Sequence, residues 1–267
     1  MRSPLENVMK AAVAAVQAGA NIISIADTTG YATPFAQDRS ISRYVKSLKA
    51  EFLNRGLHAK IEIHCHNDRG LALANALDAY QAGADIIDTT VMGLGERAGI
   101  VDLAQLLINL IDCEEQPCWN LSELKELYDL VSDRAYISIP PHQPVVGKNA
   151  FTHYAGVHVK AVAKDEALYE SLSPEILGRK PDLALGMQSG CTAVKLALKQ
   201  IGKSALVDNP ELVAKILQEI KAIAKRGTPI DIDKELPAIV ERCANNSKEF
   251  KIEDFRLQIE ETCAISN

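Results

Sequence analysis

A short repeated segment constrains the fold more than any other feature of the sequence. Ala-Gly-Ala-Asn-Ile-Ile at residues 18–23 recurs as Ala-Gly-Ala-Asp-Ile-Ile at residues 82–87, 64 positions later. In both copies an apolar helical pattern ends at the glycine, and a short apolar strand follows. A third strand pattern at residues 60–66 lies between the copies. Strands that alternate with helices in this way predict a parallel α/β sheet or a (β/α)8 barrel.

The apolar spacing also predicts where the elements begin and end. The expected helices are 4–18, 34–53, 70–82, 101–111, 121–134, 209–227 and 231–244, and the expected strands are 21–27, 60–66 and 85–91. We expect strand 21–27 to be buried. The break at Ile139-Pro140-Pro141 predicts a domain boundary near 138. The expected domains are a partial barrel (1–138), a linker with a second subdomain (139–204) and a helical subdomain (205–267).

Charge and composition exclude several classes of function. The net charge of −6 and pI of about 5.6 argue against nucleic acid or an anionic membrane as partner. No apolar run approaches the ~18–20 residues needed to span a bilayer, and the first residues do not form a signal peptide. The six cysteines include no CxxC pair and indicate reduced thiols. The sequence therefore predicts a cytoplasmic protein.

Polar residues gather where each predicted strand ends. Asp27 and Thr28 end the first strand, His64 and His66 end the second, and polar residues 89–96 follow the third. In an extended chain residues i and i+2 point the same way, so His64 and His66 face one side and Cys65 the other. The pair is either two thirds of a divalent-metal site or two polar histidines at a strand end. The spacing alone leaves both readings open.

Five motifs occur together in one order. They are Asp-Thr-Thr-Gly-Tyr-Ala-Thr-Pro (27–34), His-Cys-His-Asn-Asp (64–68), Gly-Leu-Gly-Glu-Arg-Ala-Gly (93–99), Gly-x-Asn-Ala-Phe-x-His-x-x-Gly-x-His (147–158) and Ser-Pro-Glu-x-x-Gly (173–178). Together they resemble the isopropylmalate synthase and homocitrate synthase branch of the metal-dependent Claisen-condensing TIM-barrel enzymes. The resemblance runs from residue 1 to about residue 240.

The resemblance implies an acyltransferase that condenses acetyl-CoA with a 2-oxo acid at a divalent metal, Mg, Mn or Zn. The metal would polarise the ketone as a Lewis acid, and imidazoles are good ligands for such metals. His64 and His66 match the two histidine ligands of the family. Thr28 and Glu96 match positions that bind the oxo acid.

Two further residues are implied by the second-domain motifs. His158 matches a histidine that helps to deprotonate the acetyl methyl group, and Tyr169 matches a nearby tyrosine. In the family they come from the other subunit of a dimer, so the resemblance implies a dimer. The alternative for both residues is ordinary packing in a loop.

Substrate choice remains open at this stage. Family lyases carry a cysteine in the glycine-rich loop, and its absence from residues 93–99 favours a synthase. Ile100 is typical of homocitrate synthases, whereas many isopropylmalate synthases have Asn there. Synthases of citrate or other alkylmalates share the motifs. Gln188 and Cys191 depart from the family pattern, and we interpret Cys191 as a small buried thiol.

By resemblance, the predicted strands are the last three of eight, and three strands cannot close a barrel. Strand 21–27 is then expected to expose an unpaired apolar edge. The strand with the acidic metal ligand is not found in the sequence. We therefore expect either a second chain that supplies the first barrel half or a non-catalytic regulatory partner of a full-length relative. A metal-dependent hydrolase is less favoured, because its His-x-His typically sits on the first strand.

Overall fold

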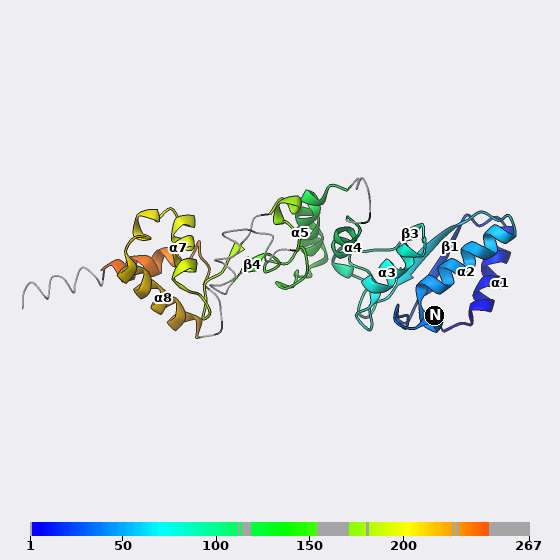
Figure 1. Cartoon of the computed structure of the whole chain (residues 1–267), viewed down its shortest axis with the longest axis horizontal. Coiled ribbons are helices and arrows are strands. Elements are labelled where there is room, and N and C mark those ends of the chain that lie inside the picture. The colour runs from blue at the N-terminus through cyan, green and yellow to red at the C-terminus, as the bar shows by residue number, and fades with distance from the viewer. Residues whose placement is uncertain are drawn as a thin grey trace, which may run out of the picture. The chain divides into compact units, whose positions relative to one another are not determined.

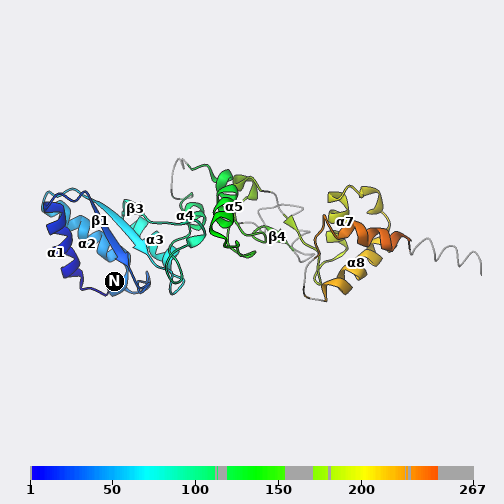
Figure 2. The same ribbon diagram turned by 180° about the vertical axis from the view of Figure 1, so that it is seen from behind.

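The computed structural model describes residues 2–111, 113, 119–153, 171–179, 182–225, 227 and 230–245. The chain divides into unit 1, Met1–Ala150, and unit 2, Phe151–Asn267. Figures 1 and 2 show the elements of both units from opposite sides. In the described part of the chain, no helix is long and apolar enough to cross a membrane.

Unit 1 follows the alternation of helix and strand that the repeat predicts. Its elements are α1 (Leu5–Gln17), β1 (Ile22–Asp27), η1 (Gln37–Arg39), α2 (Ile41–Asn54), β2 (Lys60–Cys65), α3 (Ala72–Gln81), β3 (Ile86–Ile87), η2 (Val91–Gly93), α4 (Leu103–Leu110), η3 (Leu121–Glu123) and α5 (Leu124–Ala135). The helix expected from residue 34 begins only at Ile41, because residues 34–40 form a loop and the short η1.

The strands form one parallel sheet in the order β1-β2-β3, which confirms the predicted parallel arrangement. β1 lies at an edge of this sheet, as expected, and Ile22 at its start is 47% exposed. β3 is shorter than the predicted strand 85–91. Its chain leaves the sheet after Ile87 and turns back, so that the Thr90 amide donates to the Val101 carbonyl at 3.0 Å.

A glycine in the left-handed region ends each of the first three helices. Gly19, Gly56 and Gly83 have φ values of +104°, +64° and +90°. After each glycine, the next amide donates to a carbonyl five residues back, as from Ala20 to Ala15 and from Ala84 to Ala79. This is the Schellman arrangement, in which glycine avoids the strain that a Cβ would cause. The repeat in the sequence is therefore a repeated helix-to-strand turn.

Within the described part of unit 1, helices cover one face of the sheet and leave the other open. Figure 1 shows α1 and α2 side by side along β1. Ile25, Ile61 and Ile63 are buried with α1, α2 and α3 in one core. Residues 22, 24 and 26 are exposed on the other face, so the prediction that strand 21–27 is buried was wrong for every second residue. His64 lies on this less covered face.

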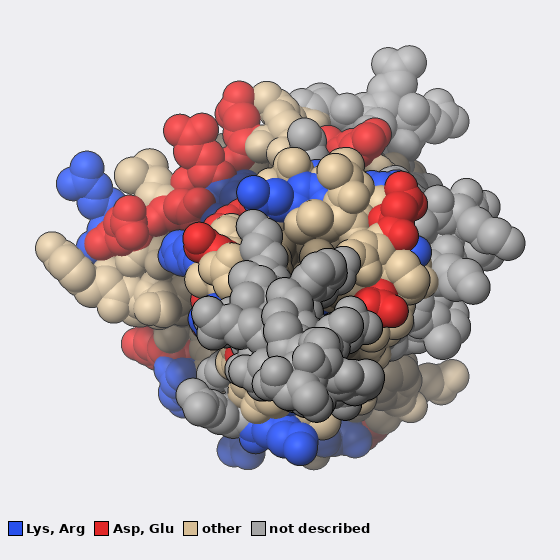
Figure 3. All heavy atoms as spheres, turned by 90° about the vertical axis from the view of Figure 1, so that its left-hand side faces the viewer, with Lys and Arg blue, Asp and Glu red and all other residues tan. Residues whose placement is uncertain are grey.

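The described part of unit 2 holds β4 (Thr152–His153), η5 (Pro174–Leu177), β5 (Asp182–Leu183), α7 (Cys191–Gln200), η6 (Ser204–Leu206), α8 (Pro210–Ala224) and helical residues 236–245. Asn209 caps α8 as predicted, since its side chain accepts from the Leu212 amide at 3.0 Å. Cys191 is exposed at the start of α7, so its interpretation as a buried thiol was wrong. Figure 3 shows acidic and basic side chains interspersed on one face of the molecule.

Candidate metal centre

The two histidines of the predicted metal pair lie beside each other at the end of β2. The Nε2 atoms of His64 and His66 are 3.2 Å apart, and the two rings meet edge to face with their centroids 4.9 Å apart. Cys65, between them in sequence, is fully buried in the core on the opposite face. The expected division of the three side chains between two faces is therefore confirmed.

The spacing of the two nitrogens fits a shared metal ion. Metal–nitrogen bonds of about 2.0–2.1 Å, at tetrahedral to octahedral angles, hold two nitrogens roughly 2.8–3.4 Å apart. The observed 3.2 Å lies inside this range. The same contact can also be an N–H···N hydrogen bond when no metal is bound. The separation of 3.2 Å is therefore compatible with both arrangements.

Asp88 is a residue that the sequence analysis did not identify. It follows β3, and its Oδ2 accepts a hydrogen bond from Nδ1 of His64 at 3.0 Å. A carboxylate on one nitrogen of an imidazole sets the tautomer and leaves the lone pair on the other nitrogen, here Nε2. The parallel register pairs Ile63 with Ile87. The residues that follow them, His64 after Ile63 and Asp88 after Ile87, therefore lie next to each other. The pairing register of β2 with β3 is the signal that could have identified Asp88 as a partner of His64.

His66 is 8% exposed, and its Nδ1 has no hydrogen-bond partner among the described residues. A buried polar atom without a partner is costly, which indicates that a group from outside these residues belongs beside it. The described residues also contain no cluster of three or more His, Cys, Asp or Glu that could hold a metal. Among the described residues, the predicted pair of His64 and His66 thus has no third ligand of these types beside it.

The loop that carries Thr28 is shaped by a buried carboxylate. Asp27 is fully buried, and its two carboxylate oxygens accept from the amides of Tyr31 at 3.0 Å and Ala32 at 2.8 Å. These bonds fold the chain into a turn directly after β1. Thr28 is exposed in this turn, where its hydroxyl is free to meet a ligand.

Arg97 joins the loops that follow all three strands. Its guanidinium donates to both carboxylate oxygens of Asp68, at 2.6 and 3.0 Å, and to the Thr28 carbonyl at 2.6 Å. Bidentate pairs of this kind are among the strongest side-chain hydrogen bonds. The Arg97 guanidinium holds the pKa of the Asp68 carboxyl below its usual range. A Cβ on Gly30 would lie 3.0 Å from Asp68, so glycine lets these loops meet.

The glycine-rich loop at residues 93–99 is closed at its two ends. The Ile100 amide donates to the Gly93 carbonyl at 3.1 Å, and the Gly99 carbonyl accepts from the Asn67 amide at 2.9 Å. Glu96, predicted to bind substrate, has a side chain that is 86% exposed and lies 3.8 Å from the Arg97 guanidinium. The loop thus holds Glu96 in solvent, beside the same arginine that contacts Thr28.

A buried polar network supports the chain behind this loop. Asp102 accepts hydrogen bonds from Tyr128 at 3.0 Å, from Gln143 at 2.9 Å and from the Gln105 amide at 2.9 Å. Burial raises the pKa of Asp102, although these hydrogen bonds oppose the shift. Burial likewise raises the pKa of the Cys65 thiol, to about 12, which makes this thiol a packing group rather than a metal ligand.

The structure brings together His64, His66 and Asp88, and it joins the loop of Thr28 to that of Glu96 through Arg97. His158 and Tyr169, the predicted second-domain residues, lie outside the described residues.

Comparisons with known proteins match both units. Residues 1–131 match the family described as HMGL-like, and residues 145–228 match a homocitrate synthase post-HMGL domain-like family. A homocitrate synthase of Pyrococcus horikoshii is 38% identical over 221 residues, covering 83% of this chain and 57% of that protein. Homocitrate synthase AksA of Methanocaldococcus jannaschii is 38% identical over 250 residues, covering 92% and 59%.

A 2-isopropylmalate synthase of Methanocaldococcus jannaschii is 34% identical over 242 residues, covering 90% of this chain and 45% of that protein. The chain thus spans about half the length of the curated relatives it matches, between 45% and 59%.

Proposed function

The chain belongs to the family of homocitrate and isopropylmalate synthases, and on this basis we propose that it forms part of an acyltransferase that condenses acetyl-CoA with a 2-oxo acid. The observation that carries the proposal is the convergence of His64 Nε2 and His66 Nε2 at 3.2 Å. Two imidazoles side by side at the carboxyl ends of parallel strands are suited to hold a divalent metal.

In the proposed reaction, His64 and His66 hold Mg, Mn or Zn. When bound, the ion supplies Lewis acidity that polarises the ketone of the oxo acid. Thr28 and Glu96 bind the oxo acid from the two loops that Arg97 joins. His158 and Tyr169, from the second domain of a partner subunit in a dimer, act on the acetyl group. His158 takes a proton from the methyl carbon, and this carbon then attacks the ketone carbon. The electrons of the C=O π bond move to the oxygen, which takes up a proton to become a hydroxyl group, and water then hydrolyses the thioester and releases CoA.

We further propose that the segment works as the C-terminal part of a (β/α)8 barrel and requires the remaining strands. The sheet has three strands, too few to close a barrel, and its face with residues 22, 24 and 26 is open. The missing carboxylate ligand and a partner for His66 Nδ1 would come from those strands. This holds whether they belong to the same polypeptide or to another one.

Among oxo acids, we propose 2-oxoglutarate, which gives homocitrate. The relatives at 38% identity carry the name homocitrate synthase, and the isopropylmalate synthase is 34% identical. Ile100, buried beside the glycine-rich loop, is the sequence feature that agrees with this choice. The alternative substrates are 2-oxoisovalerate, oxaloacetate and pyruvate, which would make the enzyme an alkylmalate or citrate synthase.

The test is an assay of CoA release from acetyl-CoA, with each of the four oxo acids and added Mg²⁺, Mn²⁺ or Zn²⁺. We expect no release by the 267-residue chain alone, and release with 2-oxoglutarate once a polypeptide with the preceding strands is co-expressed. Release by the chain alone would refute the need for further strands. No release by the combined preparation, with any oxo acid, would refute the acyltransferase and favour a non-catalytic regulatory partner.

A further inference from the structure

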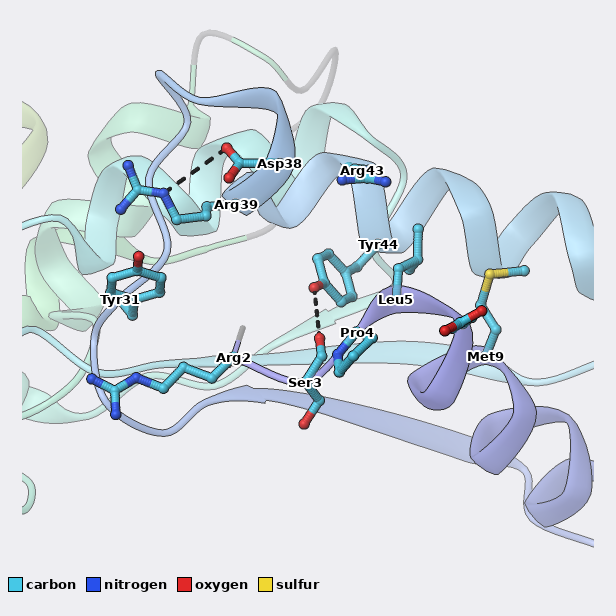
Figure 4. A pocket seen from close by; sticks show the side chains of 11 residues that line it. Arg2, Ser3, Pro4, Leu5, Met9, Tyr31, Asp38, Arg39, Arg43 and Tyr44 are labelled. Carbon is cyan, nitrogen blue, oxygen red and sulfur yellow. Dashed lines mark hydrogen bonds and ion pairs between the residues drawn. The ribbon is translucent and has the colours of Figure 1, made fainter.

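A cavity of about 810 Å³ in unit 1 takes no part in the proposed reaction. Figure 4 shows it from close by. Its walls come from residues 2–9, which lead into α1 and include its first turns, from Tyr31 in the loop after β1, and from residues 38–44 across η1 and the start of α2. None of the predicted catalytic, metal-binding or substrate-binding residues lines it.

The cavity lies toward the carboxyl ends of the strands, where the candidate metal centre also lies. In alternating parallel structures each helix starts near the carboxyl end of the preceding strand. The cavity is bounded by the start of α2 and by Tyr31, which follows β1 by four residues. Thr28 also follows β1, so the cavity and Thr28 both lie toward the carboxyl ends of the strands.

Positive charge is concentrated around this cavity, although the chain is acidic overall. Arg2, Arg39 and Arg43 line it, together with the carboxylates of Asp38 and Glu6. Asp38 is 4.0 Å from Arg39, and its side chain is 76% exposed. Across the described residues, no carboxylate lies within 4.0 Å of Arg2 or Arg43. In a protein with a net charge of −6, such uncompensated guanidiniums mark a place where an anion is attracted.

The guanidiniums of Arg2 and Arg39 both lie against the ring of Tyr31. Figure 4 shows the Tyr31 ring between Arg39 and Arg2, whose Cζ atoms lie 4.8 and 5.6 Å from the ring centroid. The Tyr44 hydroxyl donates to the Ser3 carbonyl at 3.0 Å, which fixes the chain next to Arg2. Stacking uses the faces of the guanidiniums and leaves their N–H edges available to an oxyanion.

We propose that this cavity binds a phosphate group, either that of a phosphate monoester or free phosphate. A carboxylate is satisfied by one bidentate arginine, whereas the three terminal oxygens of a phosphate can accept from several guanidiniums in different directions. Arg39 ends η1 and Arg43 lies in the first turn of α2, and both line the cavity beside the start of that helix, where the helix dipole adds positive potential. The 3′-phosphate of coenzyme A is one source, which rests on the proposed function, and free phosphate is the other.

Isothermal titration calorimetry of the full chain with acetyl-CoA, acetyl-dephospho-CoA and inorganic phosphate tests the proposal. We expect Arg43→Gln and Arg39→Gln each to weaken binding of the phosphate ligand about tenfold, because each removes a charge-assisted hydrogen-bond donor. Arg55→Gln is the matched control: it removes the same charge at the other end of α2, from an arginine paired with Glu51. Circular dichroism checks that each variant is folded.

The outcomes separate this site from the proposed function. Binding of acetyl-CoA that weakens without its 3′-phosphate, and in both cavity variants, supports the site with coenzyme A as the source. Binding of inorganic phosphate alone, lost in the same variants, supports the site with free phosphate as the source. The proposed phosphate site would be overturned if wild type and the cavity variants bound every phosphate ligand equally well. It would also be overturned if Arg55→Gln lost as much affinity as the cavity variants, or if no phosphate ligand bound to the wild-type chain. The acyltransferase assay is read separately.

Discussion

Replacing Asp88 by alanine is expected to weaken binding of Zn²⁺ to the chain by about tenfold. Loss of the carboxylate that orients a histidine ligand typically costs 10–100-fold in metal affinity. The bond from His64 Nδ1 to Asp88 is 3.0 Å long, but the two side chains are 30% and 37% exposed. Water can therefore replace part of this hydrogen bond. We accordingly expect the loss of Zn²⁺ affinity to lie at the lower end of that range, about tenfold, which corresponds to about 1.4 kcal/mol of binding free energy.

The affinity is measured by competition with a chromophoric chelator, using circular dichroism to confirm that each variant is folded. Asp88→Asn keeps an acceptor oxygen without its charge and should fall between wild type and Asp88→Ala. His64→Ala removes a ligand and should lose more. Asp129→Ala, an exposed carboxylate on α5, is the control for net charge. If Asp88→Ala bound Zn²⁺ as wild type does while His64→Ala did not, the orienting role would be refuted.

Further predictions concern the surroundings of the site. Arg97→Gln should speed amide hydrogen exchange in residues 28–31, because the guanidinium no longer holds that loop; unchanged exchange would contradict this. Tyr128→Phe should lower the unfolding free energy of unit 1 by about 1–3 kcal/mol in urea titrations, since the Ala104 amide and Asp102 lose a partner. Burial raises the folded-state pKa of Asp102, so the folded form binds its proton more tightly than the unfolded form. The unfolding free energy of the wild-type chain, compared with that of Asp102→Asn, should therefore fall as the pH rises from the ordinary carboxyl pKa through the raised pKa. Wild-type and Asp102→Asn unfolding free energies that change in parallel with pH would contradict this. Cys65, with its pKa raised to about 12, should react with iodoacetamide only on unfolding, whereas the exposed cysteines react at pH 8 in the folded chain.

Local patterns were sufficient to predict most of unit 1. The helices could be predicted because their apolar spacing and the glycines at their ends, such as Gly19 and Gly83, involve only residues that are close in sequence. The parallel sheet followed from the alternation of helix and strand. The pairing of His64 with His66 needed only the two-residue period of a strand. These features depend on neighbours in sequence, which is why sequence alone reveals them.

The remaining features depend on contacts between distant residues. Asp88 reaches His64 across 24 positions, and only the register of β2 with β3 brings them together. The early end of β3 depends on the return of the chain to pair Thr90 with Val101. Arg97 reaches Thr28 across 69 positions, and its positive φ of 58° follows from the loop it closes. No periodicity in the sequence encodes such contacts.

In the glycine-rich loop, the residues that set the path of the chain differ from those whose side chains can meet a ligand. Gly99 has a φ of +81°, and a Cβ there would lie 1.8 Å from the Gly93 carbonyl oxygen, so the two ends of the loop touch backbone to backbone. Because this contact leaves no space for a side chain, the path of the chain is set at positions 93 and 99. The residues between them can then be exchanged without moving the strands or the histidines. Selection for a different ligand can act on these side chains while the scaffold stays the same.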